Sequence, residues 1–97
     1  MISIRYNKQA QNDLENIYET IAKDKKMAAD SFVNKIDTYI KLLSTTPEMG
    51  KECKKSGIER DCRVIYYKNY TILYKIYKTH VSIKRVISSK QNIKENR

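Results

Sequence analysis

The segment that decides the fold runs from Asn69 to Ile87 and reads NYTILYKIYKTHVSIKRVI. Two runs rich in β-branched and aromatic residues flank the polar residues 78–80, a pattern that predicts a β-hairpin. Side chains alternate along a strand, so each run has one apolar face. These faces carry Ile72, Tyr74 and Ile76 in the first run and Val81, Ile83 and Ile87 in the second. Strict alternation also puts Arg85 on the second apolar face. Either a β-bulge re-aims this side chain, or the sheet carries a charge on a partly open face.

Before this hairpin, the residue pattern predicts one strand and two helices. Alternating apolar residues indicate a short strand over residues 2–6, and Asn7 follows at a helix N-cap position. Apolar residues then recur at helical spacing over 8–23 and over 28–45. Pro47 ends the second run, because the residue before a proline avoids the helical region. The short connection between the two runs predicts an antiparallel helical hairpin.

Three strands complete the predicted domain, over residues 61–67, 70–77 and 81–87. They form an antiparallel meander, with a tight turn at Lys68 and Asn69 between the first two. Residues 51–57 are expected to form a mobile basic loop. The element order is therefore strand, helix, helix, strand, strand, strand. This order predicts an α+β fold with two helices packed on one face of a twisted, mostly antiparallel sheet.

The length of 97 residues corresponds to one domain, residues 1–97, with a frayed tail at 93–97. No apolar run approaches the roughly 20 residues that cross a bilayer, so we expect no contact with a membrane. The first five residues lack the charged start and long apolar middle of a signal peptide. The expected location is therefore the cytoplasm.

Cys53 and Cys62 are the only cysteines in the sequence, and His80 is the only histidine. These are too few soft ligands for a four-ligand zinc site, and we expect neither a metal nor another cofactor. Two cysteines allow a disulfide by count, but cytoplasmic proteins normally keep thiols reduced. We therefore interpret both cysteines as structural or incidental.

The excess positive charge lies entirely in the second half of the chain. Residues 1–50 carry seven basic and seven acidic side chains, whereas residues 51–97 carry thirteen basic and four acidic ones, which accounts for the net charge of +9. Such a field attracts polyanions or an acidic protein partner. Arginine and tyrosine interleave along the same strands, a combination that binds nucleic acid or proteins. The sequence leaves both alternatives open.

The residues that carry catalysis in common motifs are absent from this sequence. It contains no phosphate-binding loop, nucleophile elbow or paired metal-ligand motif, and its two glycines exclude a glycine-rich cradle. Acidic residues are scarce in the strand half, which argues against a two-carboxylate site. We therefore assign no catalytic residue.

Several short pieces, in a characteristic order and spacing, carry a family resemblance. They are Ala10, Asp13, Leu14, Ile17, Ile21 and Ala22, then Ala28, Phe32 and Ile36, then Leu43 with residues 47–50 (PEMG), Arg60, residues 69–74 (NYTILY) and residues 81–87 (VSIKRVI). With these pieces the chain resembles toxins of the RelE/ParE superfamily over nearly its whole length. These toxins are the poison half of bacterial type II toxin–antitoxin modules, which include plasmid-stabilisation systems.

The superfamily contains two activities, and the resemblance favours the ParE-like one. RelE-like members cleave messenger RNA in the ribosome with basic residues, often together with a tyrosine, and Thr71 and Asn92 stand where that branch commonly has basic residues. ParE-like members poison DNA gyrase and carry the Pro-x-x-Gly, Arg and Asn-Tyr-x-Ile-x-Tyr pieces found here, although Ser88 replaces their usual histidine. The expected protein is a ParE-like toxin that is not an enzyme. The alternatives are a metal-independent mRNA endonuclease of the RelE type and an inactive binding module.

The resemblance also implies contact residues and partners. The residues expected to contact the target or partner are Arg60, Arg63, Tyr70, Tyr74, Lys84, Arg85 and Lys90, with weaker contacts from Lys51, Lys54 and Lys55. The implied target is DNA gyrase, or the ribosome with its mRNA in the alternative. The second implied partner is a small acidic antitoxin that wraps the toxin in a hetero-oligomer, and its charge would complement the basic half.

Overall fold

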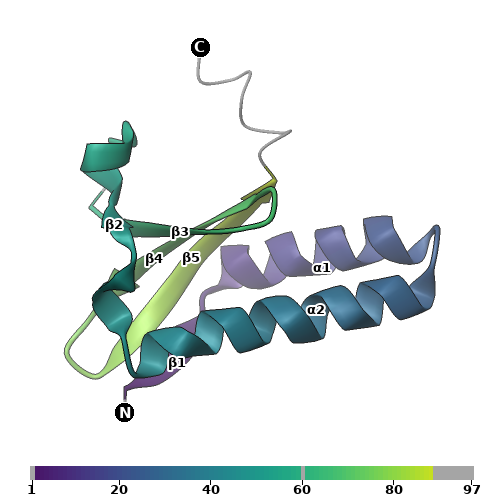
Figure 1. Cartoon of the computed structure of the whole chain (residues 1–97), viewed down its shortest axis with the longest axis horizontal. Coiled ribbons are helices and arrows are strands. Elements are labelled where there is room, and N and C mark those ends of the chain that lie inside the picture. The colour runs from purple at the N-terminus through teal and green to yellow at the C-terminus, as the bar shows by residue number, and fades with distance from the viewer. Residues whose placement is uncertain (1, 60, 89–97) are drawn as a thin grey trace.

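The computed structural model describes residues 2–59 and 61–88. It shows a twisted five-stranded sheet with two helices on one face (Figure 1). The strands are β1 (Ser3–Tyr6), β2 (Lys51–Glu52), β3 (Arg63–Tyr67), β4 (Tyr70–Ile76) and β5 (His80–Ser88). The helices are α1 (Lys8–Ala22) and α2 (Lys26–Ile40), and short 3-10 turns cover Lys41–Ser44, Pro47–Met49 and Cys53–Ser56. The predicted α+β class and element order are confirmed.

The helical hairpin begins at the predicted N-cap. The Asn7 side chain accepts a hydrogen bond from the backbone N–H of Ala10 at 2.9 Å, which satisfies one of the free donors at the start of α1. The second helix begins two residues earlier than predicted, at Lys26, and its last predicted turn is a 3-10 turn rather than α-helix. No helix among the described residues is long and apolar enough to cross a membrane.

The sheet has the order β1-β5-β4-β3-β2. The predicted meander of β3, β4 and β5 is confirmed, and β1 extends it by pairing parallel to β5, with Ile4 opposite Val81. The prediction of a loop over residues 51–57 is wrong. Lys51 pairs with Val64 at the edge of the sheet, because this segment continues the antiparallel ladder beyond β3 before it turns into the 3-10 turn.

A bulge in β5 interrupts its pairing with β4. Tyr74 faces Ile83 and the preceding residue Leu73 faces Arg85, so Lys84 is an extra residue on β5. A bulge of this kind reverses the faces of the residues that follow it. Of the two alternatives left open for Arg85, the structure therefore has the β-bulge.

The reversal corrects the predicted faces at the end of β5. Val86, and not Ile87, joins Val81 and Ile83 in the core beneath the helices. Ile87 instead packs against a smaller cluster on the opposite face. Arg85 shares the orientation of Leu73, which belongs to that smaller cluster. The bulge therefore keeps the arginine out of the main core.

Two apolar clusters lie on the two faces of the sheet. The main core lies between the sheet and the helices and consists of Ala10, Ile36, Ile40, Leu43, Ile65, Ile72, Tyr74, Val81, Ile83 and Val86. The smaller cluster is formed by Cys53, Val64 and Leu73, with Ile58, Cys62 and Ile87 packed against it. Cys53, Ile58 and Cys62 thus cover part of the face that the helices leave open.

Candidate functional site

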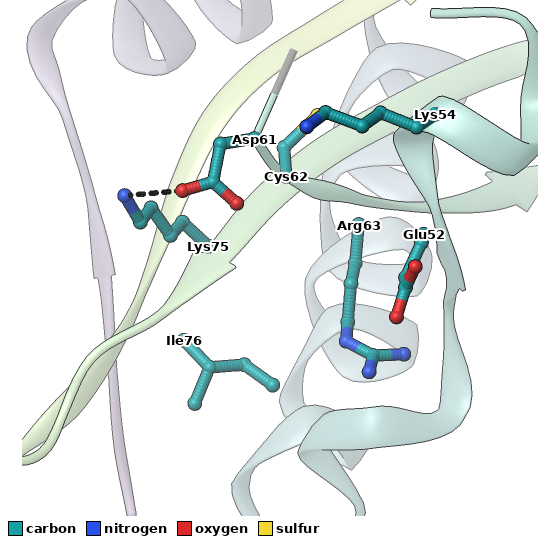
Figure 2. A pocket seen from close by; sticks show the side chains of 7 residues that line it. All are labelled: Glu52, Lys54, Asp61, Cys62, Arg63, Lys75 and Ile76. Atoms are coloured by element: carbon teal, nitrogen blue, oxygen red, sulfur yellow. Dashed lines mark ion pairs between the residues drawn. The ribbon is translucent and has the colours of Figure 1, made fainter.

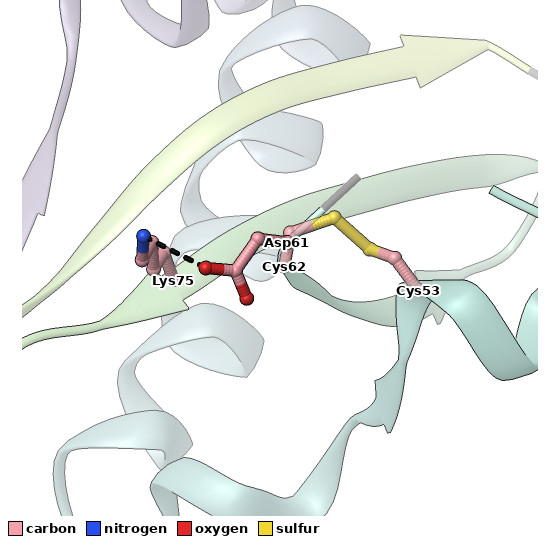
Figure 3. Close-up of a disulfide and its surroundings, with 4 residues drawn as sticks. All are labelled: Cys53, Asp61, Cys62 and Lys75. Atoms are coloured by element: carbon pink, nitrogen blue, oxygen red, sulfur yellow. Dashed lines mark ion pairs between the residues drawn. A yellow bond between two sulfur atoms is a disulfide. The ribbon is translucent and has the colours of Figure 1, made fainter. Parts of the chain in front are cut away.

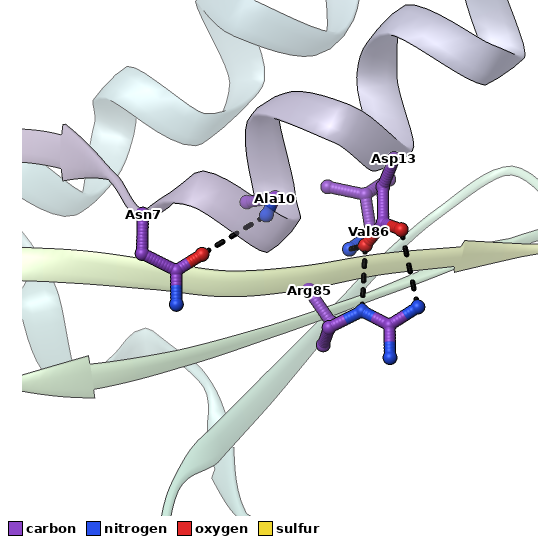
Figure 4. Close-up of polar contacts among 5 residues, drawn as sticks. All are labelled: Asn7, Ala10, Asp13, Arg85 and Val86. Carbon is purple, nitrogen blue, oxygen red and sulfur yellow. Dashed lines mark hydrogen bonds and ion pairs between the residues drawn. The ribbon is translucent and has the colours of Figure 1, made fainter.

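Arg85 lies beside α1 and is held by Asp13 (Figure 4). Its Nε donates to Asp13 Oδ2 at 2.7 Å and its Nη2 donates to Oδ1 at 3.1 Å, a bidentate pair of the strong, charge-assisted kind. This hydrogen bond raises the pKa of Arg85 above its usual value. The side chain remains 32% exposed, so Arg85 can still reach a partner at the surface.

Asp13 also completes the edge of β5. Among the described residues, β1 pairs with β5 only as far as Ile83, because the chain turns into α1 after Tyr6. The backbone N–H of Val86 lies beyond that point and donates to Asp13 Oδ2 at 2.9 Å. The Asp13 carboxylate therefore accepts the hydrogen bond of a backbone N–H that no neighbouring strand reaches, and it also positions the Arg85 side chain.

A groove of about 530 Å³ runs between α1 and the ends of β4 and β5. Arg85 and Asp13 lie in it together with Tyr70, whose ring centroid is 5.1 Å from that of Phe32 on α2. The remaining lining residues are Asn16, Ile17, Thr20, Ile21, Asn69, Val86 and Ser88. The structure therefore brings together two of the predicted contact residues, Tyr70 and Arg85.

Tyr74 is fully buried, so its prediction as a contact residue is wrong. Its hydroxyl donates to the carbonyl of Pro47 at 2.7 Å and accepts from the N–H of Gly50 at 2.9 Å. Burial raises the pKa of this phenol. A Cβ atom at Gly50 would lie 2.5 Å from the Tyr74 hydroxyl and 2.8 Å from the Val64 carbonyl. The Pro-x-x-Gly piece, residues 47–50, and this tyrosine therefore form one structural unit that fixes the position of the chain before β2.

Arg63 lines a second hollow, a cavity of about 320 Å³ at the end of β4 (Figure 2). Its Nη1 donates to the Gly50 carbonyl at 2.6 Å. The cavity contains three cations, Lys54, Arg63 and Lys75, and two carboxylates, Glu52 and Asp61, with Cys62 and Ile76. Lys75 and Asp61 form an ion pair at 3.0 Å, which lowers the pKa of Asp61 and raises that of Lys75.

Lys84, the bulge residue, contacts an aromatic residue at the β4–β5 turn. Its Nζ donates to the Tyr77 hydroxyl at 3.0 Å, and Tyr77 stacks on His80 with ring centroids 4.9 Å apart. This hydrogen bond lowers the pKa of Tyr77. Tyr77, His80 and Lys75 were not among the predicted contact residues, because the pairing of these side chains across the β4–β5 hairpin depends on its register, which the residue pattern does not fix.

The three lysines of the predicted loop lie in two different elements. Lys51 is in β2, and Lys54 and Lys55 are exposed on the 3-10 turn that follows. A disulfide joins Cys53 to Cys62, with their Cα atoms 5.3 Å apart (Figure 3). The expectation that both thiols are reduced is therefore wrong for this structure. Pairing of β2 with β3 brings the residue after β2, Cys53, next to the residue before β3, Cys62. The backbone N–H of Cys53 accordingly donates to the Cys62 carbonyl at 2.8 Å.

The predicted contact residues do not form one site. Tyr70 and Arg85 lie in the groove, Arg63 and Lys54 in the cavity, and Lys84 at the β4–β5 turn. Arg60 and Lys90 lie outside the described residues. Within residues 2–59 and 61–88, no three His, Cys, Asp or Glu side chains cluster as a metal site would require. Asp13 was missed as a site residue because 72 positions separate it from Arg85.

The fold and the comparisons with known proteins define the class, a toxin of a type II toxin–antitoxin system. The family model of the ParE toxin of the type II toxin-antitoxin system, parDE, matches residues 4–93, so the chain belongs to the ParE toxin family. Among solved structures, the chain is similar to one described as the chromosomal ParDE TA system from P. aeruginosa. That alignment has a TM-score of 0.75 and 17% sequence identity, and it covers 91% of this chain and 96% of the other. A comparison with curated proteins gave no match.

Proposed function

We propose that this toxin stops bacterial growth by poisoning DNA gyrase in the cytoplasm. The observation that carries the proposal is the match of the ParE toxin family to residues 4–93. The groove with Arg85 and the cavity with Arg63 supply partly exposed cations for contacts with a large partner. Arginine is favoured in such contacts because its planar guanidinium binds acidic groups in pairs of hydrogen bonds.

The proposal includes a second partner, an antitoxin that neutralises the toxin in a hetero-oligomer. The similar P. aeruginosa structure is described as a ParDE TA system, that is, as a toxin–antitoxin system. The net charge of +9 in residues 51–97 favours an acidic partner, because complementary potentials speed and orient association. The groove beside α1 offers both apolar side chains, such as Ile17 and Ile21, and the Arg85 guanidinium to such a segment.

A RelE-like mRNA endonuclease is the second candidate function. The observation in its favour is the phenol of Tyr77, which receives a hydrogen bond from Lys84 and lies 5.5 Å from Lys75 Nζ, measured to the ring centroid. Basic residues with a tyrosine are the groups that the RelE-like branch uses. An inactive binding module on the same fold would show neither activity.

Two assays on the purified toxin separate these functions. We expect it to block supercoiling by gyrase and to leave ribosome-bound message intact in a translation extract. Lys54→Gln should weaken the block, whereas Lys35→Gln, which removes one exposed charge from α2, should leave it unchanged. Cleavage of message at codon positions with gyrase unaffected would replace the proposal by the second candidate. Inactivity in both assays would indicate the binding module.

A further inference from the structure

The β4–β5 turn carries a cluster of rings and cations that the proposed contacts with gyrase and the antitoxin leave unused. The Tyr77 ring is 38% exposed and stacks on His80, with an interplanar angle of 18°. Lys75 Nζ lies 5.5 Å and Lys84 Nζ lies 5.2 Å from the Tyr77 ring centroid. Lys78 is exposed in the same turn. Two lysines therefore lie close to a partly exposed aromatic ring, and a third is exposed in the same turn.

Packing does not explain this cluster. Neither Tyr77 nor His80 belongs to either apolar cluster of the described residues. Like charges repel, so gathering ammonium groups around one ring is unfavourable unless an anion lies between them or the ring attracts them. The Lys84 hydrogen bond to the Tyr77 hydroxyl fixes one ammonium at the ring edge and lowers the pKa of the phenol. The arrangement thus holds cations next to an aromatic face.

The cations continue from the turn into the cavity. Lys75 contacts the Tyr77 ring and also lines the cavity that contains Arg63 and Lys54 (Figure 2). The one carboxylate that pairs with Lys75 belongs, among the described residues, to Asp61, whose side chain is 85% exposed. A carboxylate so exposed is easily displaced by a second anion, because surface ion pairs contribute little.

We propose that the β4–β5 turn binds single-stranded nucleic acid, with a base stacked on the Tyr77–His80 pair and the flanking phosphates bound by Lys75 and Lys84. Single strands are bound by this combination of aromatic platforms and backbone-tracking cations. An acidic peptide would use the lysines but would leave the aromatic pair without a role. The proposal goes beyond the proposed target and does not depend on it, since it concerns the isolated toxin.

The first test measures the phosphate contacts. Fluorescein-labelled dT12 and rU12 are titrated with the oxidised toxin at several NaCl concentrations, and anisotropy gives the affinity. The double variant Lys75→Ala/Lys84→Ala should reduce the slope of log K against log salt by about 1.4, since each single-strand phosphate contact contributes about 0.7. The matched control is Lys23→Ala/Lys25→Ala at the α1–α2 turn, at the other end of the molecule (Figure 1). An equal loss of slope in the control would overturn the proposal.

The second test measures stacking. Tyr77→Ala should weaken binding by roughly 5- to 100-fold with little change of the salt slope, because a stacked base contributes independently of charge. Tyr77→Phe keeps the ring and should bind like the wild type. Equal binding by Tyr77→Ala and Tyr77→Phe would show that no base stacks there. The dT12 and rU12 arms distinguish DNA from RNA.

A third variant should act in the opposite direction. Asp61→Asn removes the carboxylate that competes for Lys75, so we expect dT12 to bind more tightly. Unlabelled polyglutamate of the same charge should displace dT12 poorly. If polyglutamate displaces it equally well, or if Asp61→Asn binds more weakly, the turn is an acidic-protein surface or a structural cluster and the proposal fails.

Discussion

At the scale of single residues, the Asp13 carboxylate accepts hydrogen bonds from three donors on β5. Two come from the Arg85 guanidinium and one from the backbone N–H of Val86. The carboxylate is only 15% exposed, so these bonds are less screened by water than those of a surface pair. The contact fixes α1 against the one stretch of β5 that β1 does not reach.

Asp13→Asn tests this contact. The amide keeps one acceptor oxygen for Val86 but loses the charge that binds Arg85, so the unfolding free energy should fall by about 1–3 kcal/mol. Urea denaturation followed by circular dichroism measures the change. The control is Asp30→Asn, which breaks the exposed pair with Lys26 and should change stability little. An equal loss in both variants would contradict a special role for Asp13.

Gly50 is required by its close contact with Tyr74 and not by its backbone angles, since its φ is −82°. Gly50→Ala should therefore lower the unfolding free energy by about 1–3 kcal/mol through overpacking.

Tyr74→Phe should lower the unfolding free energy by a similar amount, because the Gly50 N–H and the Pro47 carbonyl lose their partner. Denaturation of both single variants and the double variant forms a cycle. The combined loss should be smaller than the sum, and strict additivity would show that the two residues act separately.

At the scale of elements, a disulfide closes the connection between β2 and β3, and Cys53, Ile58 and Cys62 of this connection pack on the face of the sheet opposite the helices. The connection starts at the end of β2 and ends at the start of β3, and the disulfide joins its two ends (Figure 3). Cys53 is fully buried against Val64 and Leu73. The segment also supplies Lys54 and Asp61 to the cavity, so its position determines the charge there.

Reduction of this disulfide should lower stability. A cross-link across nine positions lowers the entropy of the unfolded chain and thereby raises the unfolding free energy by about 2–3 kcal/mol. This corresponds to roughly 10–20 °C in the thermal midpoint of a domain of this size. Calorimetry with and without a dithiol measures the shift. The variant Cys53→Ala/Cys62→Ala should not respond to the dithiol. A wild-type midpoint that is equally indifferent would show that the bridge does not support the fold.

At the scale of the whole molecule, charge is divided between the two layers. Residues 1–50, which include both helices, are neutral, whereas residues 51–97 carry the entire +9. The described part of the second half, residues 51–59 and 61–88, carries nine basic and three acidic side chains. Since the helices cover one face of the sheet, the positive field extends from the other face and from the sheet edges. An acidic partner would therefore approach the molecule from one side.

This asymmetry predicts how the antitoxin binds. Lys54→Ala/Lys55→Ala should slow association with the acidic antitoxin by roughly two- to tenfold and flatten its salt dependence, because exposed charges act mainly on the encounter. Lys23→Ala/Lys25→Ala removes the same charge from the helical turn and should change the rate less. Stopped-flow association at low and high salt measures both. Equal slowing by the two variants would show that total charge, and not its position, controls the encounter.

Much of the fold could be predicted because it depends on local patterns. The change between helical and strand periodicity located both helices and four of the five strands, and Asn7 identified the start of α1. Arg85 pointed to an irregularity in β5, because a charge at an apolar position of a strand indicates either a bulge or a partly open face, and the structure has the bulge. The two-residue strand β2 had no such signal, because it is too short for any periodicity.

The sequence by itself thus determined the fold class, the element order and the basic half, while the tertiary structure decided the surroundings of the site. Tyr74 and Tyr70 look alike in the sequence, yet packing against Pro47 and Gly50 buries the first and leaves the second in the groove. Asp13 becomes the partner of Arg85 only because α1 packs beside β5. The physical reason is that periodicity acts between near neighbours, whereas hydrogen bonds, ion pairs and the disulfide depend on which distant segments the packed elements bring together.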